Sequence, residues 1–301
     1  MMAFIEDNLS VFGVEPICRF LPIAPSTFYA RLSVMRDPKL ASDRAKRDIG
    51  HCEDIKRIWD DNCQVYGARK VWHVLRREGK DIARCTVERL MKVMGLQGVV
   101  RGKKVITTKP DTAQLCPDDK VNRQFNATAP NRLWVSDFTY VSSWTGMVYV
   151  AFVIDVFARK IVGWRVSTSM TTAFVLDALN QAICQRCPVE ADRLIHHSDR
   201  GSQYLSIKYT ERLVDTGIDG SVGSVGDSYD NAMAESIIGL FKTEVINRIG
   251  PWKSSSAVEW ETMKWVDWYN TTRLLEPIGY ITPNEAEDAF YENLNRAGKA
   301  A

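Results

Sequence analysis

The sequence predicts a mixed α/β core preceded by an all-helical region. Up to about residue 98 the apolar residues recur at helical spacing, and residues 99–130 are polar, basic and punctuated by proline. From residue 131 onward, β-rich runs are followed by alternating strands and helices. We therefore divide the chain into helical segments 1–35 and 40–98, a linker 99–130, a core 131–290 and a tail 291–301.

The composition is that of an ordinary globular protein. The 301 residues are enough for about two domains, with 45% hydrophobic and 25% charged residues. No apolar run reaches the roughly 20 residues that span a bilayer, and the first residues do not resemble a secretory signal. Seven cysteines, an odd number, indicate reduced thiols. We expect a cytoplasmic protein with no membrane partner.

The charges are unevenly distributed along the chain. Lys and Arg total 39 against 37 Asp and Glu, but the basic residues dominate residues 1–110 and the acidic residues dominate the remainder. A region that grips DNA, attached to a metal-binding catalytic domain, would show this asymmetry. Chance asymmetry on solvated surfaces is the alternative.

The first 35 residues predict two short helices. Residues Asn8–Leu21 carry apolar side chains at helical spacing, and a second helix is expected over Phe28–Leu32. Ser26 or Thr27 is the expected N-cap of that second helix. Two short helices joined by a tight break resemble a helix-turn-helix.

A second helical pair is expected over Val71–Glu78 and Ala83–Met94, with Gly95 ending the second helix. The basic residues of that helix lie off its apolar face, where a recognition helix presents side chains to the major groove of DNA. We expect these residues to bind DNA: Arg84, Arg89 and Lys92. A helical hairpin with a polar outer face is the alternative.

The linker contains a basic cluster that includes Arg101, Lys103 and Lys104. Cations in an irregular segment can lie along DNA phosphates, which gives affinity without sequence reading. We expect these three residues to contact DNA. A merely flexible tether is the alternative.

The core begins as an antiparallel meander and continues as strands alternating with helices. The expected strands are Leu133–Val141, Met147–Phe157, Lys160–Ser167, Arg193–Ser198 and Gly220–Val225. The expected helices are Thr171–Cys184, Ser206–Gly217 and a long helix Asp230–Arg248, followed by a helical, aromatic-rich end. This order predicts a mixed sheet flanked by helices.

Three carboxylates stand where catalytic groups are expected. Asp137 lies within an apolar strand, where a buried charge is costly unless it is paired or bound to a metal ion. Asp199 follows another strand, and Glu235 lies on the long helix, on a face with Gly239 that could approach the sheet. Mg²⁺ or Mn²⁺ prefers such oxygen ligands, and two ions together promote in-line displacement at phosphorus.

Several long motifs give the sequence a family resemblance. Thirty-five residues separate Asp199 from Glu235. Four motifs are continuous segments: Trp134–Tyr140, His197–Tyr204, Asp227–Ser236 and Leu240–Glu244. A closing motif consists of Tyr269, Asn270, Arg273, Gly279, Tyr280 and Pro283. The sequence resembles the catalytic subunit of bacterial insertion-sequence transposases of the insertion-sequence-three type, relatives of the retroviral integrases. One departure is Leu274 directly after Arg273, near which the family often has a histidine.

The resemblance implies a ribonuclease-H-like core behind a helix-turn-helix-like region. It implies that Asp137, Asp199 and Glu235 are catalytic and bind two Mg²⁺ or Mn²⁺ ions, while Lys242, on the same helical face as Glu235, contacts the DNA end. The expected substrates are double-stranded element ends, with their terminal inverted repeats, and a DNA target. A multimer of this chain and an upstream helix-turn-helix/leucine-zipper protein, joined by frameshifting, are the expected partners.

Two other functions remain open from the sequence: a ribonuclease-H-like nuclease that does not transfer strands, and a DNA-binding regulator with an inert core. Asp155 is expected to be structural or to support the metal ligands, and His197 either packs at a strand end or orients a ligand. Cys184 and Cys187 are a single pair, which favours helix packing over zinc binding. No phosphate-binding loop for ATP is present, so no nucleotide cofactor is expected.

Overall fold

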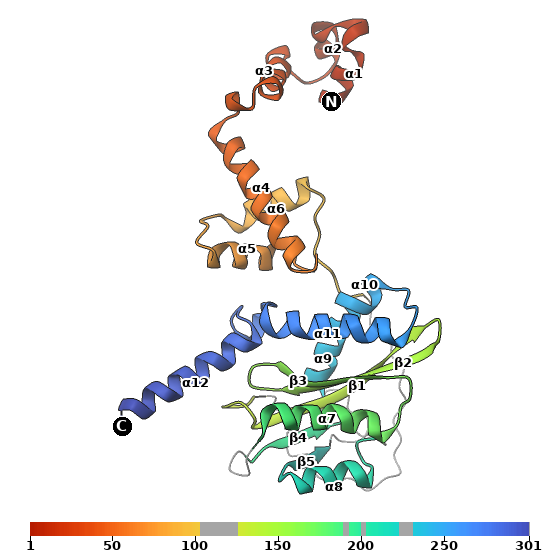
Figure 1. Cartoon of the computed structure of the whole chain (residues 1–301). Helices are drawn as coiled ribbons and strands as arrows, with labels where there is room; N and C mark the ends of the chain where they lie inside the picture. Colours follow the sequence, from red (N-terminus) through yellow and green to blue (C-terminus); the bar gives the residue numbers. More distant parts are fainter. Residues whose placement is uncertain (103–125, 189–192, 200–202, 223–230, 301) are drawn as a thin grey trace.

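A computed structural model describes residues 1–102, 126–188, 193–199, 203–222 and 231–300. The elements follow one another as three groups: helices α1–α3, helices α4–α6, and a sheet covered by helices (Figure 1). The expected order, a helical region followed by a mixed α/β core, is confirmed. None of the described helices is long and apolar enough to cross a bilayer.

The first group consists of α1 (Met2–Phe12), α2 (Val14–Phe20) and α3 (Pro25–Arg36). Two details of the prediction are wrong. The single helix expected over residues 8–21 is broken at Gly13, whose φ of 72° lies in the left-handed region that glycine tolerates. Helix α3 starts earlier than expected, with Pro25 in its first turn and Ala24 as N-cap, because proline's fixed φ suits that position.

The second group contains the two expected helices and one more. α5 (Ala68–Arg77) and α6 (Arg84–Val93) match the predicted pair, and Gly95 follows α6 with a φ of 68°. The short 3-10 turn η1 (Pro38–Leu40) leads into the additional helix, α4 (Asp43–Asp61), whose N-cap Ser42 accepts a hydrogen bond from the Ala45 N–H at 3.2 Å. The three helices bury a shared core that includes Ile55, Ile58, Val71, Leu75, Val87 and Leu90.

The sheet has five strands in the order β3-β2-β1-β4-β5. The strands are β1 (Leu133–Ser143), β2 (Gly146–Asp155), β3 (Lys160–Ser167), β4 (Ile195–Ser198) and β5 (Asp219–Val222). β1, β2 and β3 pair antiparallel, whereas β4 pairs parallel with β1 and with β5. The predicted meander and mixed sheet are confirmed, and the topology is that of a ribonuclease-H-like core.

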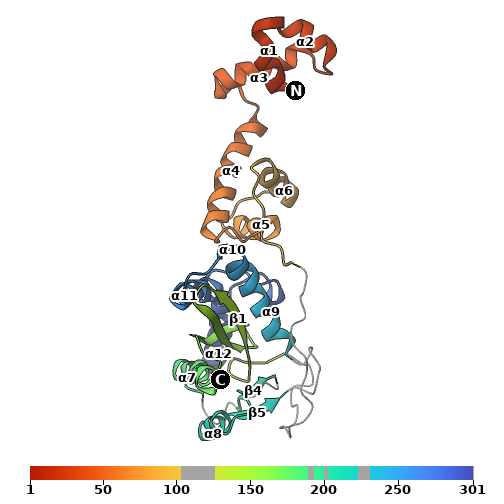
Figure 2. The ribbon, with the colours of Figure 1, turned by 90° about the vertical axis from the view of Figure 1, so that its right-hand side faces the viewer.

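Helices cover both faces of the sheet because the strands alternate their side chains. On one face Trp134, Val153 and Val162 pack with α7 (Thr172–Arg186) and α8 (Ile207–Asp215). On the other face Val135 and Phe152 pack with α9 (Ala232–Phe241) and α11 (Ser255–Thr271). Figure 2 shows α9 alongside β1, on the side of the sheet away from α7.

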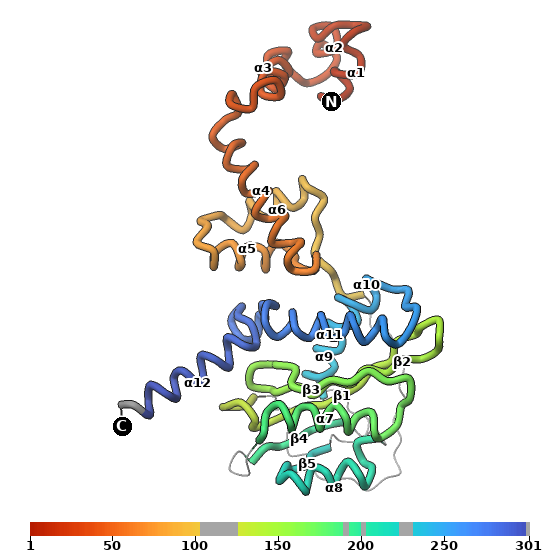
Figure 3. The backbone as a smooth tube through the Cα atoms, viewed as in Figure 1, coloured from red at the N-terminus to blue at the C-terminus, as the bar shows by residue number. Residues whose placement is uncertain are grey.

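The long helix predicted over residues 230–248 is a column of three pieces. α9 continues directly into a π-helical turn, η3 (Lys242–Ile246), and then α10 (Asn247–Ile249); residue 230 lies outside the described residues. The chain ends with α11, the 3-10 turn η4 (Glu276–Ile278) and α12 (Pro283–Ala300). In the tube of Figure 3, α12 projects from the body, and the first group of helices lies farthest from the sheet.

Candidate active site

Strand pairing brings Asp137 and Asp199 side by side. Ser136 on β1 is in register with Ser198 on the parallel strand β4, and the two aspartates are the next residues along each chain. The alternation that points Val135 toward α9 points Asp137 toward the same helix. Both carboxylates therefore stand at the carboxyl end of a parallel strand pair, on the α9 face of the sheet.

Asn231 holds the start of α9 against this edge. Its side-chain N–H donates to the Ser136 carbonyl at 3.0 Å, one residue before Asp137. Glu235 lies in the first turn of α9, and its N–H donates to the Asn231 carbonyl at 3.1 Å. Asn231 was not singled out as a functional residue from the sequence; its position at a helix start is the only local signal, because its partner is 95 residues away.

The charges of Asp199 and Glu235 both act on the carboxyl of Asp137. The pKa of Asp137 is raised well above its ordinary value, first by burial and then by the charge of Asp199, and the charge of Glu235 raises it further. The Phe138 N–H, which donates to Asp137 Oδ1 at 2.7 Å, and the ammonium of Lys242 act in the opposite direction. The apposition of acids therefore costs stability unless a cation is present.

The donor set suits a hard divalent cation. Within the described parts of the chain, no three His, Cys, Asp or Glu side chains converge closely enough to form a complete metal cluster. Mg²⁺, however, is commonly held by one or two carboxylates, with water and substrate phosphate as its other ligands. The pair Asp137 and Asp199, with Glu235 nearby, fits that mode of binding.

Two cations lie on the same face of the helical column as Glu235. Lys242, partly buried at the start of η3, places its ammonium 5.2 Å from the centre of the Tyr140 ring. Arg101 lies across Gly239, where an added Cβ would come within 2.6 Å of its guanidinium. Helix α9 contacts β1, as expected, and at Gly239 itself the missing side chain makes room for Arg101.

Buried hydrogen bonds of His196 and His197 support β1, β4 and β5 around the site. His196 accepts or donates to Ser136 Oγ at 2.7 Å and to the Tyr209 hydroxyl at 3.1 Å, and His197 Nδ1 lies 3.0 Å from Ser221 Oγ. Burial lowers the pKa of His196 to about 3. His197 is fully buried, so of its two interpretations the packed strand-end histidine is the one that the geometry fits.

Asp155 is a structural residue. It is fully buried and accepts hydrogen bonds from the backbone N–H groups of Asn131 at 2.7 Å and Phe157 at 3.0 Å. Arg186 lies 3.4 Å from the same carboxylate. These contacts join the two ends of the β1–β2 hairpin and leave Asp155 out of the carboxylate group near α9.

Tyr204 is a neighbour of the site that sequence reasoning quoted only within a motif. Its hydroxyl is buried and has no hydrogen-bond partner among the described residues. Burial raises the pKa of this phenol, and the charges of Asp137 and Asp199 raise it further. The side chain packs against Phe138, with ring centroids 6.1 Å apart.

The predicted DNA-contact residues are distributed over two regions. On α6, Arg84 and Lys92 are exposed, whereas Arg89 is held by Asp48 of α4 through two bonds of 2.8 and 2.9 Å. Arg101 is near the carboxylate site, as described above. Lys103 and Lys104 lie outside the described residues.

Comparison with known proteins covers the whole chain. Family models for an integrase core domain match residues 127–228 and 216–283, and a model for an HTH-like domain matches residues 46–104. A transposase for insertion sequence element IS629 from Shigella sonnei is 54% identical over 301 residues, covering 100% of both chains. A putative transposase for IS986/IS6110 from Mycobacterium tuberculosis is 52% identical over 279 residues, 92% of this chain and 99% of that protein.

A more distant relative is the putative transposase InsK for IS150 from Escherichia coli K12, 29% identical over 96% of this chain and 99% of its own length. Among solved structures, the HTLV-2 integrase catalytic core domain in complex with magnesium matches 53% of this chain and 98% of its own, at 16% identity and a TM-score of 0.41. Full-length identity above one half with the first relative shows the family. The chain belongs to the insertion-sequence-three family of transposases, enzymes that move DNA elements with an integrase core.

Proposed function

We propose that Asp137, Asp199 and Glu235 form the active site at which this transposase cuts the ends of its element and joins them to target DNA. The observation that carries the proposal is the register of β1 and β4. It sets the two aspartates side by side, while Asn231 fixes the helix of Glu235 against the same edge. The charges of Asp199 and Glu235 raise the pKa of the buried Asp137 carboxyl, and clustered acids that perturb one another in this way are typical of functional sites.

Mg²⁺ or Mn²⁺ is the proposed cofactor, held as two ions by these carboxylates together with water and DNA phosphate. When bound, the ions would supply Lewis acidity at the scissile phosphodiester and at the attacking oxygen. The chain's own contribution is to gather three negative charges at a fixed edge and to orient them through buried neighbours. His196, bonded to Ser136, keeps β1 and β4 in register beneath the site.

We further propose that the DNA end lies along the face of the column that carries Glu235. Lys242 and Arg101 present their charges on this face. Neither forms an ion pair with another described residue of the chain. Phosphate oxygens are the natural counter-ions of such a pair. In this proposal residues 40–98 bind the terminal repeat through α6, and residues 99–130 contact the phosphates of the DNA. Residues 131–290 cut and join the DNA.

The reaction joins two DNA ends to one target, so we propose that the protein acts as a multimer on DNA, in the bacterial cytoplasm. An upstream helix-turn-helix/leucine-zipper protein, separate or fused by frameshifting, remains a proposed partner. Joined products separate this function from a nuclease that only hydrolyses. Metal-dependent cleavage separates it from a DNA-binding regulator with an inert core.

The test is cleavage and joining of oligonucleotides that carry the element ends, in Mg²⁺ and in Mn²⁺. Asp199→Asn should abolish both reactions while leaving binding to the ends intact, because a neutral amide is a poor ligand for these ions. Asp215→Asn is the matched control, since Asp215 is exposed on α8 and away from the site. Undiminished cleavage by Asp199→Asn would remove this residue from the active site.

A further inference from the structure

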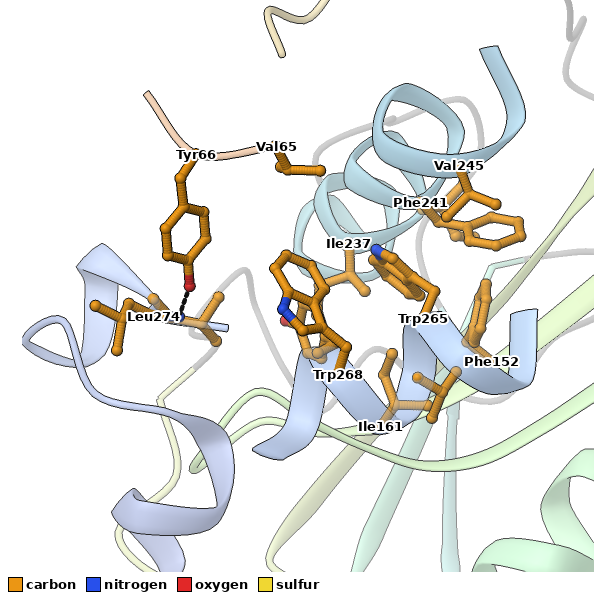
Figure 4. Close-up of a cluster of buried hydrophobic side chains, with 14 of the residues drawn as sticks. Val65, Tyr66, Phe152, Ile161, Ile237, Phe241, Val245, Trp265, Trp268 and Leu274 are labelled. Atoms are coloured by element: carbon orange, nitrogen blue, oxygen red, sulfur yellow. Dashed lines mark hydrogen bonds between the residues drawn. The ribbon is translucent and has the colours of Figure 1, made fainter. Parts of the chain in front are cut away.

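Tyr66 links the second helical group to the catalytic core. It is fully buried although it belongs to the short connection before α5. Its hydroxyl accepts a hydrogen bond from the Leu274 N–H at 2.7 Å and donates to the Thr272 carbonyl at 3.3 Å. Figure 4 shows Tyr66 above Leu274, beside the cluster that contains Trp268, whose ring centre is 5.9 Å away. A buried phenol with both hydrogen-bond functions satisfied indicates a specific contact.

Helix α5 makes the remaining contacts of this interface. The imidazole of His73 stacks on Tyr280, with ring centres 3.6 Å apart and an interplanar angle of 16°. Arg77 donates to the Tyr280 carbonyl at 3.2 Å and pairs with Glu285. Arg69 donates to Glu276 at 3.0 Å and to the Tyr280 hydroxyl at 3.4 Å, so Arg69 and Arg77 are both engaged with the core instead of being available for DNA phosphates.

The surface that receives α5 is itself fixed to the helical column of Glu235. Buried Arg273 donates through Nε to both oxygens of Glu244, at 3.2 Å each, and Trp265 Nε1 donates to Glu244 at 3.0 Å. Glu244 lies in η3, the continuation of α9. Asn270 donates to the Ile161 carbonyl of β3 at 2.8 Å and accepts from its N–H at 3.0 Å.

The closing motif of the sequence therefore has a location. Asn270, Arg273 and Tyr280 lie far along the chain from α5, yet they build the platform on which Tyr66 and α5 rest. A path of contacts, buried except at Thr272, runs from Tyr66 through the Thr272–Leu274 backbone, Arg273 and Glu244 to the column that carries Glu235.

We propose that this interface, here called the α5 dock (Tyr66, His73 and Arg77 against Thr272–Leu274, Tyr280 and Glu285), is a positioning device that sets the distance between the bound repeat and the active site. It rests on the proposed function, in which α6 grips the repeat. With α5 held by the core, α6 is carried at a fixed place relative to the carboxylates. Cleavage then falls at one phosphate, at a set number of nucleotides from the repeat.

The test maps cleavage at nucleotide resolution with the full-length protein and a labelled element end in Mg²⁺. Tyr66→Phe leaves the buried Leu274 N–H without its acceptor. The ratio of cuts at the wild-type phosphate to cuts elsewhere should then fall roughly tenfold, as expected when one buried hydrogen bond is lost. Affinity for the repeat should be unchanged. Tyr280→Ala should spread the cuts in the same way.

Two further variants serve as controls. Tyr280→Phe keeps the ring that stacks on His73 and loses only the exposed hydroxyl that accepts from Arg69 at 3.4 Å, so its pattern should stay close to that of the wild type. Trp260→Ala removes an exposed aromatic of α11 outside the dock and should not alter the pattern. Reduced total cleavage with an unchanged pattern would overturn the positioning role in favour of a general structural one. Loss of repeat affinity in Tyr66→Phe would overturn it in favour of a role in holding the DNA-binding helices themselves.

Hydrogen exchange separates the dock from the proposed function. The Leu274 amide should exchange slowly in the wild type and faster in Tyr66→Phe, whether or not the protein cleaves DNA. Equally fast exchange in both proteins would overturn the dock itself. If the Leu274 amide is protected but no metal-dependent cleavage is found, the dock exists. The proposed active site and the positioning role in cleavage would then both be wrong.

Discussion

At the scale of single residues, the surroundings of each buried acid distinguish a structural role from a proposed catalytic one. Asp155 is buried with two backbone donors and an arginine, so its charge is compensated by the fold. Asp137 is surrounded by like charges and has one backbone donor, so its charge is not compensated in the same way. The first arrangement stabilises a hairpin, and the second is the one expected of the proposed metal site.

His196 gives a prediction about pH. Burial and then the neighbouring His197 lower its pKa from 6.5 to about 3, so the folded protein keeps it neutral while the unfolded chain takes up a proton below pH 6.5. The unfolded state therefore binds more protons between about pH 6.5 and 3, and this histidine makes the unfolding free energy fall as pH falls. The slope from this one group approaches about 1.4 kcal/mol per pH unit.

Urea unfolding at several pH values checks this prediction. Carboxylates contribute to the same window, so the comparison is between the wild type and His196→Gln, in which the titrating group is removed. The variant should be less stable at pH 7 and should show a shallower loss between pH 6 and 4. Parallel pH profiles for the two proteins would show that His196 is not held neutral by the fold.

At the scale of elements, the sequence patterns located most of the core and failed where a contact is not local. The periodicity over residues 133–167 gave the meander, and the predicted strands placed Asp137 within one strand and Asp199 directly after another, where the sheet brings them together. The break at Gly13 and the start at Pro25 were missed because tertiary packing and a single dihedral angle decide them. The π turn at Lys242 also has no pattern in the local sequence.

Substitution of Gly239 tests whether the contact of Arg101 with α9 is needed for joining DNA ends. Gly239→Ala raises helix propensity by up to about 1 kcal/mol, so the unfolding free energy should not decrease. The added methyl would displace the arginine side chain, which lies within 2.6 Å of it. We therefore expect a protein of equal or greater stability with weaker joining of DNA ends.

A double-mutant cycle provides the control for this prediction. Arg101→Ala should reduce end joining by itself, and Gly239→Ala should add little in its presence, because the arginine it displaces is already gone. Additive losses would show that the two residues act separately. Neither variant changes the three carboxylates, so metal-dependent cleavage should persist in both.

At the scale of the whole molecule, the chain is a row of three groups in which distant segments meet. Tyr66 and Leu274 are 208 residues apart, and the closing motif joins the second helical group to the core. No local pattern predicts such a contact, and the resemblance to a family gave the closing motif without its location. The sequence was sufficient for the order of the groups and for the candidate acids, but not for their mutual placement.

The stability of the whole chain tests the central claim most directly, because catalytic and structural carboxylates affect it with opposite sign. Asp137→Asn removes a charge that Asp199 and Glu235 repel, and the amide oxygen can still accept from the Phe138 N–H. Urea unfolding should therefore show, with EDTA, a variant more stable than the wild type by roughly 1 to 2 kcal/mol. Mg²⁺ should stabilise the wild type alone. A variant less stable than the wild type in EDTA, or equally stabilised by Mg²⁺, would contradict a metal-binding active site at Asp137.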